Sequence, residues 1–171
     1  MKRIVFLIIF ILFASTAIAS TEFKTITNDK ESYSINLPTS WEYKFGHKGA
    51  SLVARRAATD SKDNYRENLS VIAEPLPIQI TAEQYYKNNL VTMNKMLKEF
   101  SIESFTKTKV GDREMIKLVS SYLVGMNKVK AKALFTMRGK TGYVVTITSL
   151  ETAFMNNESE FDDILNGFML P

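Results

Sequence analysis

Few side chains in this sequence have the types and spacing that catalysis requires. The only histidine is His47, and there is no cysteine. A serine or cysteine nucleophile needs a neighbouring base that takes its proton, whereas His47 lies between glycines in the segment Gly46-His47-Lys48-Gly49, which is typical of an exposed turn. The sequence also contains no glycine-rich phosphate loop, CxxC pair or HExxH helix. We therefore predict a non-enzymatic protein that needs no cofactor and no metal ion.

Four carboxylates lie close together near the C-terminus, and they allow two interpretations. They are Glu158, Glu160, Asp162 and Asp163. Carboxylate oxygens are ligands for hard cations such as calcium. The same residues stand at the front of a predicted helix, where the helix dipole stabilises negative charge. We expect the second interpretation to hold, because the dipole alone accounts for carboxylates at that position.

Three lysines form the one feature that stands out as a candidate binding surface. Lys128, Lys130 and Lys132 alternate along a predicted strand, so their amines share one face and lie about 7 Å apart. None of the residues expected opposite them is acidic: Leu123, Ser121 and Val119. The row is a candidate patch for an anionic partner. The alternative is a solvated edge strand whose lysines discourage pairing with other sheets.

The elements that must position these residues include one long helix, predicted over Ile80–Phe100. Thr81 and Gln84 have the spacing of a capping box, in which each side chain bonds the backbone N–H of the other residue. An apolar stripe of period 3.6 follows and should pack on a sheet. Its members are Ala82, Tyr86, Leu90, Met93, Leu97 and Phe100. Two further helical segments are expected over Glu151–Met155 and Glu158–Asn166.

Most of the remaining chain alternates apolar and polar residues, which predicts strands with one buried face. Strands are expected over residues 23–27, 33–37, 50–56, 68–74, 101–110 and 112–123, followed by two more. Because residues opposite one another share a face, Phe135 should pair with Ile116. Met137 should pair with Tyr143, which leaves a three-residue turn. The pattern predicts an α+β domain with a single antiparallel β-sheet and helices packed on it.

The first residues have the pattern of an export signal. A basic start, Met1-Lys2-Arg3, precedes the apolar run Ile4–Phe13 and the ending Ala17-Ile18-Ala19. We predict a signal peptide over residues 1–19, with cleavage after Ala19, and a single domain over residues 20–171. The alternative is a membrane anchor, but Ile4–Ala19 is 16 residues long, short of the ~20 that a spanning helix needs. The expected location is therefore periplasmic or secreted.

Charge and cysteine content narrow the possible partners. The chain has a formal charge of +4, and loss of Lys2 and Arg3 leaves 20 basic against 18 acidic side chains. Such a balance is not typical of nucleic-acid binding, which uses a clustered basic face. Without cysteine the mature protein has no disulfide and no lipid-bearing cysteine after the signal, so its stability must come from its core. We expect no transmembrane segment after cleavage.

The segment Tyr33–Trp41 ends a predicted strand with the pattern Leu-Pro-x-x-Trp, and here the sequence resembles the PsbP/DcrB-type families of exported proteins. The resemblance continues in four further segments: Glu67–Val71, Thr81–Tyr86, Gly139–Thr146 and Phe161–Phe168. It implies a PsbP-like α-β-α sandwich, in which a single antiparallel β-sheet is flanked by helices on both faces. It also implies a non-enzymatic accessory or binding role.

Pro38 and Trp41 carry this motif and have two interpretations. Proline ends a strand, and tryptophan can bury a large surface where the chain turns. Alternatively, Trp41 stacks on a ligand in a groove between helix and sheet. The expected function is that of an exported accessory protein of the cell envelope that acts through contacts with another envelope or secreted protein. The alternative is a periplasmic carrier of a small apolar or anionic ligand in a groove near Trp41.

Overall fold

The computed structural model describes residues 21–58 and 65–171. The predicted signal peptide therefore lies outside the described residues. Within them the order of elements is β1 Phe23–Asn28, β2 Tyr33–Pro38, β3 Trp41–His47, β4 Ala50–Arg56, β5 Asn68–Pro75, α1 Ala82–Met96, β6 Lys98–Val110, β7 Arg113–Val124, β8 Asn127–Arg138, β9 Thr141–Leu150 and α2 Glu151–Asn166.

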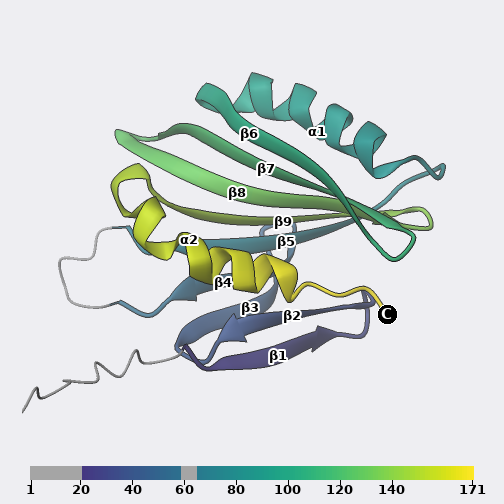
Figure 1. Ribbon diagram of the computed structural model, residues 1–171, viewed down its shortest axis with the longest axis horizontal. Helices are drawn as coiled ribbons and strands as arrows, with labels where there is room; N and C mark the ends of the chain where they lie inside the picture. The colour runs from purple at the N-terminus through teal and green to yellow at the C-terminus, as the bar shows by residue number, and fades with distance from the viewer. Residues whose placement is uncertain (1–20, 59–64) are drawn as a thin grey trace, which may run out of the picture.

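A large antiparallel sheet dominates the structure (Figure 1). Its seven strands have the order β3-β4-β5-β9-β8-β7-β6. The prediction of a single sheet is wrong in one respect, because β1 and β2 pair only with each other and form a separate two-stranded ribbon. The apolar side chains of β2 explain this difference. Tyr33, Ile35 and Leu37 are buried in the core with residues of α2 and of the large sheet, so the ribbon packs on a face and does not extend an edge.

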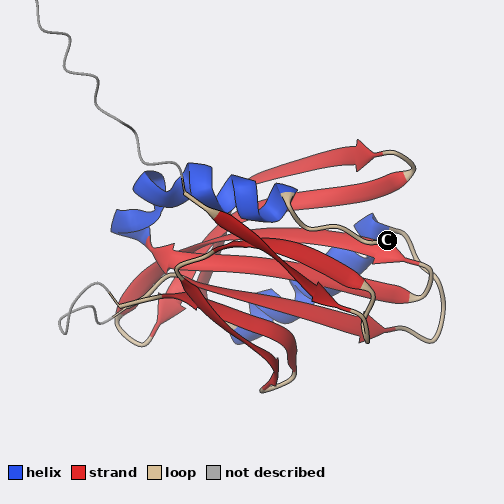
Figure 2. Cartoon of the chain, turned by 90° about the horizontal axis from the view of Figure 1, so that it is seen from below, coloured by secondary structure: helices blue, strands red, loops and turns tan. Residues whose placement is uncertain are grey.

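Both faces of the large sheet contribute to a core, but the helices cover them unequally. One face packs on α1 through Ile116, Leu118, Ala133, Phe135 and Val144. The other face packs on α2 and on the ribbon, and its buried sheet residues include Leu52, Leu69, Val71, Leu134 and Val145. Figure 2, seen from below, shows α1 behind the strands. The structure therefore differs from the expected sandwich, in which helices alone flank both faces. Helix α2 shares its face with the ribbon, and α1 packs mainly on β6, β7 and β8.

Helix α1 begins as predicted and ends earlier. The capping box is present, with Gln84 N donating to Thr81 Oγ1 at 3.1 Å and Thr81 N donating to Gln84 Oε1 at 3.0 Å. The helix stops at Met96, because Leu97 is extended and the chain enters β6 directly. Phe100 consequently lies on β6, although it still packs against the α1 cluster.

The register between β7 and β8 is confirmed. Ile116 lies opposite Phe135, and Leu123 lies opposite Lys128. Correct register matters because a slip of one residue would turn every side chain of the strand to the other face.

The predicted register between β8 and β9 is wrong by one residue. Met137 lies opposite Gly142, and the turn has two residues, with Gly139 at a φ of 56°. A Cβ atom at position 142 would lie 2.4 Å from the ring of Tyr85, so only glycine fits beneath that ring. Tyr143 faces the ribbon instead, where its hydroxyl donates to the carbonyl of Glu31 at 2.8 Å.

Candidate functional site

The lysine row lies on β8, which is an interior strand. The interpretation of the row as a protective edge is therefore wrong, since β7 and β9 flank it on both sides. The residues opposite Lys128, Lys130 and Lys132 are those predicted from the register. Carboxylates nevertheless reach the amines from α2, which packs on this face, and from β6, which lies two strands away in the sheet. These partners could not be located from strand register alone.

Each amine of the row is paired with at least one carboxylate. Lys128 lies 2.9 Å from Glu151, and Lys130 lies 2.5 Å from Glu103. Lys132 lies 3.2 Å from Glu158 and 2.8 Å from Asp162, both on α2.

Burial differs strongly along the row. Lys132 is only 7% exposed, and the Lys130 amine also lies 4.8 Å from the centre of the Phe154 ring. The exposed Lys128 amine is hydrogen-bonded to Glu151, which raises the pKa of the lysine. The ion pairs of the row therefore link α2 and β6 to β8.

Binding of an anionic partner to the lysine row stays a prediction, and such a partner would have to compete with these carboxylates.

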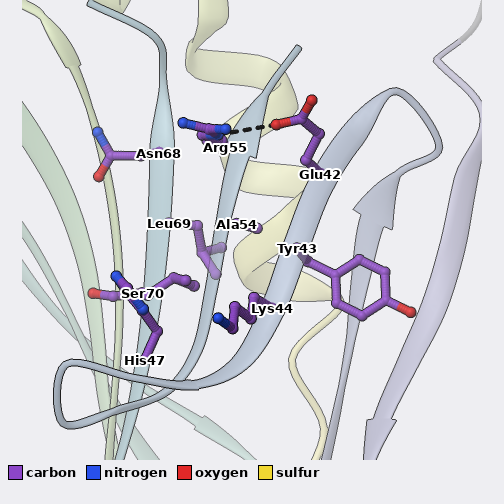
Figure 3. A pocket seen from close by; sticks show the side chains of 10 residues that line it. Glu42, Tyr43, Lys44, His47, Ala54, Arg55, Asn68, Leu69 and Ser70 are labelled. Carbon is purple, nitrogen blue, oxygen red and sulfur yellow. Dashed lines mark hydrogen bonds and ion pairs between the residues drawn. The ribbon is translucent and has the colours of Figure 1, made fainter.

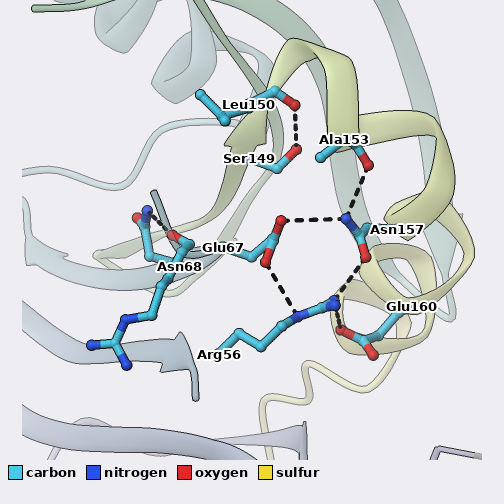
Figure 4. A network of polar contacts seen from close by, with 9 residues as sticks. Arg56, Glu67, Asn68, Ser149, Leu150, Ala153, Asn157 and Glu160 are labelled. Carbon is cyan, nitrogen blue, oxygen red and sulfur yellow. Dashed lines mark hydrogen bonds and ion pairs between the residues drawn. The ribbon is translucent and has the colours of Figure 1, made fainter. Parts of the chain in front are cut away.

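Three of the four carboxylates near the C-terminus serve as ion-pair partners. Glu158 and Asp162 pair with Lys132, and Glu160 pairs with Arg56 (Figure 4). The helical segments predicted over Glu151–Met155 and Glu158–Asn166 form one continuous helix, α2, so these carboxylates do not stand at its front and the helix-dipole interpretation is wrong.

Arg56, the last residue of β4, lies 2.7 Å from Glu160 and donates to Asn157 Oδ1 at 2.9 Å. Its Nε atom lies 3.3 Å from Glu67. Within residues 21–58 and 65–171, no group of three or more histidine, cysteine or acidic side chains is arranged to hold a metal ion.

The structure places Pro38 and Trp41 in structural positions. Pro38 is the last residue of β2 and lies opposite Phe23. Trp41 opens β3 and is 2% exposed, within the core that α2 covers. Its ring is surrounded by protein, so the space next to it is not a groove. The interpretation of Trp41 as a stacking surface for a ligand finds no support in this geometry.

A hollow does lie on the strands that follow Trp41, on the sheet face that carries Lys44 and Arg55 (Figure 3). Tyr43, Ala54 and Leu69 also contribute to its lining. It has a volume of about 530 Å³, and its lining includes the basic side chains of Lys44, His47 and Arg55. Asn68 and Ser70 of β5 add polar groups.

The single carboxylate that lines this hollow is already engaged by arginines. Glu42 lies 2.9 Å from Arg55 and 3.7 Å from Arg66. The balance of charge around the hollow is therefore basic.

The other face of β3 is aromatic. Tyr43 and Phe45 lie opposite Ala54 and Leu52, whose side chains point into the α2 core. Their rings are 5.8 Å apart and are 43% and 41% exposed. Phe45 also lines a second hollow, of about 650 Å³, between the turn of the ribbon and the turn that joins β3 to β4.

Hydrogen bonds hold the ribbon beside this second hollow. Tyr33 Oη and Ser51 Oγ are 2.7 Å apart, and Asn28 donates to both of them. Ser51 also donates to Glu31. Burial raises the pKa of Tyr33, so the hydroxyl keeps its proton. These polar groups form hydrogen bonds with one another and hold the ribbon against β4.

The basic and aromatic surface of β3 was not identified from the sequence. The signal was present in Glu42-Tyr43-Lys44-Phe45, where charged and aromatic residues alternate. Such alternation, with large apolar residues on one side and charges on the other, is typical of a strand. Only the strand order shows that β3 is an edge strand.

Comparison with known proteins identifies the fold. No protein-family model matches the sequence, and no curated protein matches it. Solved structures do match. The solution structure of cyanobacterial PsbP (CyanoP) from Synechocystis sp. PCC 6803 has a TM-score of 0.67 at 17% identity, covering 94% of this chain and 99% of that one.

Two further structures have the same fold. LpqN of Mycobacterium tuberculosis, described as involved in cell envelope biogenesis, has a TM-score of 0.65 at 12% identity over 88% of this chain and 91% of that one. The Ran-binding protein Mog1p of Saccharomyces cerevisiae has a TM-score of 0.60 at 10% identity, over 88% and 96%. The expected PsbP-like fold is confirmed. In the described part of the chain, no helix has the length and apolar character needed to cross a membrane.

Proposed function

We propose that this PsbP-like protein is an exported, non-enzymatic accessory protein of the cell envelope that acts through contacts with another protein. The observation that supports this most is the fold, which is matched over 94% of the chain by cyanobacterial PsbP. LpqN, described as involved in cell envelope biogenesis, and the Ran-binding protein Mog1p have the same fold. An accessory role in the envelope and a role in protein binding are both consistent with these neighbours.

The alternative is a carrier of a small ligand, and the geometry changes where that ligand would bind. Trp41 is buried, so the proposed groove beside it is replaced by the hollow on β3, β4 and β5. That hollow lies on an open sheet face and is not enclosed by the protein. Sites for small molecules are usually enclosed. The geometry therefore favours a protein partner.

Export is expected to leave a mature chain that begins at Ser20. The basic start and the short apolar run that ends at Ala19 carry this expectation. N-terminal sequencing of the protein from the extracytoplasmic fraction of its host is the direct measurement. A chain that still begins at Met1 and stays with the membrane would show that the segment is an anchor. Changing Ala17 and Ala19 to bulky residues should block processing and lead to accumulation of the full-length chain.

A protein partner and a small ligand differ greatly in mass. Native mass spectrometry of the protein purified from its own host therefore distinguishes the two functions.

A further inference from the structure

Strand β3 is one of the two edges of the large sheet, and β4 is the only strand that pairs with it among the described residues. An edge strand points unpaired N–H and C=O groups outward, where another chain can pair with them. The Lys24 amine donates to the carbonyl of Trp41 at 3.5 Å and so covers the start of the strand. Residues 42–46 are exposed and include Tyr43, Lys44 and Phe45.

The opposite edge, β6, is built differently. Its register against β7 shifts between Lys98 and Ser101 and again between Ile102 and Ser104. Such irregularities bend an edge strand and discourage pairing. Lys107 on this strand is also engaged, at 2.9 Å from Glu83 and 2.6 Å from Glu114. No such register shift interrupts the pairing of β3 with β4.

Hollows lie on both faces of β3, and they differ in chemistry. The hollow of about 530 Å³ presents Lys44, Arg55 and His47. Among the described residues, no carboxylate lies within 4.0 Å of the Lys44 amine. The lining of the hollow of about 650 Å³ includes Phe45 together with the charged residues Asp29, Lys30 and Glu31 of the ribbon turn. Side chains of an added strand would alternate between these two faces.

We propose that β3 accepts an extended segment of a partner protein as a further strand of the sheet, and that this segment alternates acidic and apolar residues. This inference rests on the proposed function, since it assigns the surface and the chemistry of the protein contact. Acidic side chains of the segment face Lys44 and Arg55, and its apolar side chains cover Tyr43 and Phe45. Main-chain hydrogen bonds supply affinity in this mode of recognition, and alternate side chains supply specificity.

The test uses an eight-residue, end-capped peptide of alternating glutamate and valine, titrated into the isotope-labelled protein and followed by NMR. We expect saturable shifts of the amides of Glu42–His47. Lys44→Glu should weaken the affinity about tenfold, because it places like charges opposite each other. A peptide with lysine in place of glutamate should bind at least about tenfold more weakly for the same reason. Affinity for the glutamate peptide should fall with added salt.

The matched control is Lys109→Glu, which makes the same charge change at an exposed position of the other edge strand, β6. It should leave the affinity within about twofold. The inference is overturned if the peptide does not bind, if the shifts appear on β6 or α1, if Lys44→Glu binds as well as the wild type, or if two copies of the chain pair through β3 and exclude the peptide.

Binding of the natural partner to the wild type and to Lys44→Glu tests this inference independently of the proposed function. A partner that binds the wild type and Lys44→Glu equally leaves the proposed function standing and refutes the β3 site. A host-derived protein that carries a small ligand and no partner refutes the proposed function, whatever the peptide does.

Discussion

Replacing Lys132 with glutamate is expected to lower the free energy of unfolding by about 3–5 kcal/mol, because it puts an unpaired negative charge at a buried position. Lys132 is 7% exposed and lies between Glu158 and Asp162 of α2. The substitution removes the only amine in contact with these two carboxylates among the described residues and adds a third negative charge beside them. Helix α2 should be loosened from β8 first, since all three groups lie at that contact.

Two matched variants separate charge from packing. Lys132→Met keeps the apolar stem and removes the charge, so its cost should be smaller, about 1–3 kcal/mol. Lys128→Glu makes the same charge change four residues earlier, on an amine whose side chain is 57% exposed, and should cost less than about 1 kcal/mol. Urea denaturation followed by the fluorescence of the single tryptophan measures all three. Equal midpoints for Lys132→Glu and Lys128→Glu would contradict the buried pairing.

Trp41→Ala is expected to lower the free energy of unfolding by about 3–5 kcal/mol, because it leaves a cavity where a large, buried side chain stood. Trp41→Phe should cost clearly less. Phenylalanine fills most of the space, and the indole N–H has no hydrogen-bond partner among the described residues, so no bond is lost. Circular dichroism in urea measures both variants, since each removes the fluorescent reporter. If Trp41→Ala kept its stability and lost a bound ligand instead, the assignment of Trp41 to the core would be wrong.

Local patterns predicted much of the fold, because they depend on neighbours in the sequence. The capping box of α1 is a contact between Thr81 and Gln84, three residues apart, and it is present. The register of β7 on β8 followed from matching the apolar face around Ile116 and Phe135. Both inferences needed only a side-chain period and the rule that paired residues share a face.

Contacts between distant segments could not be predicted in this way. The prediction of a three-residue turn, Gly139-Lys140-Thr141, was wrong because Gly142 must fit beneath the ring of Tyr85. That ring belongs to a helix more than fifty residues earlier in the sequence. The carboxylates that pair with the lysine row could not be predicted, because they come from α2 and β6 and not from the strands opposite. The β3 surface was missed because an edge strand is defined by strand order, which no local pattern contains.

Native mass spectrometry of the protein purified from the extracytoplasmic fraction of its own host tests the proposed protein contact most directly. The expected spectrum contains the chain from Ser20 in a stoichiometric complex with a second protein. The chain released from that complex should have the mass of the polypeptide alone. A stoichiometric small molecule on the chain, with no protein partner, would contradict the proposed function and favour a carrier.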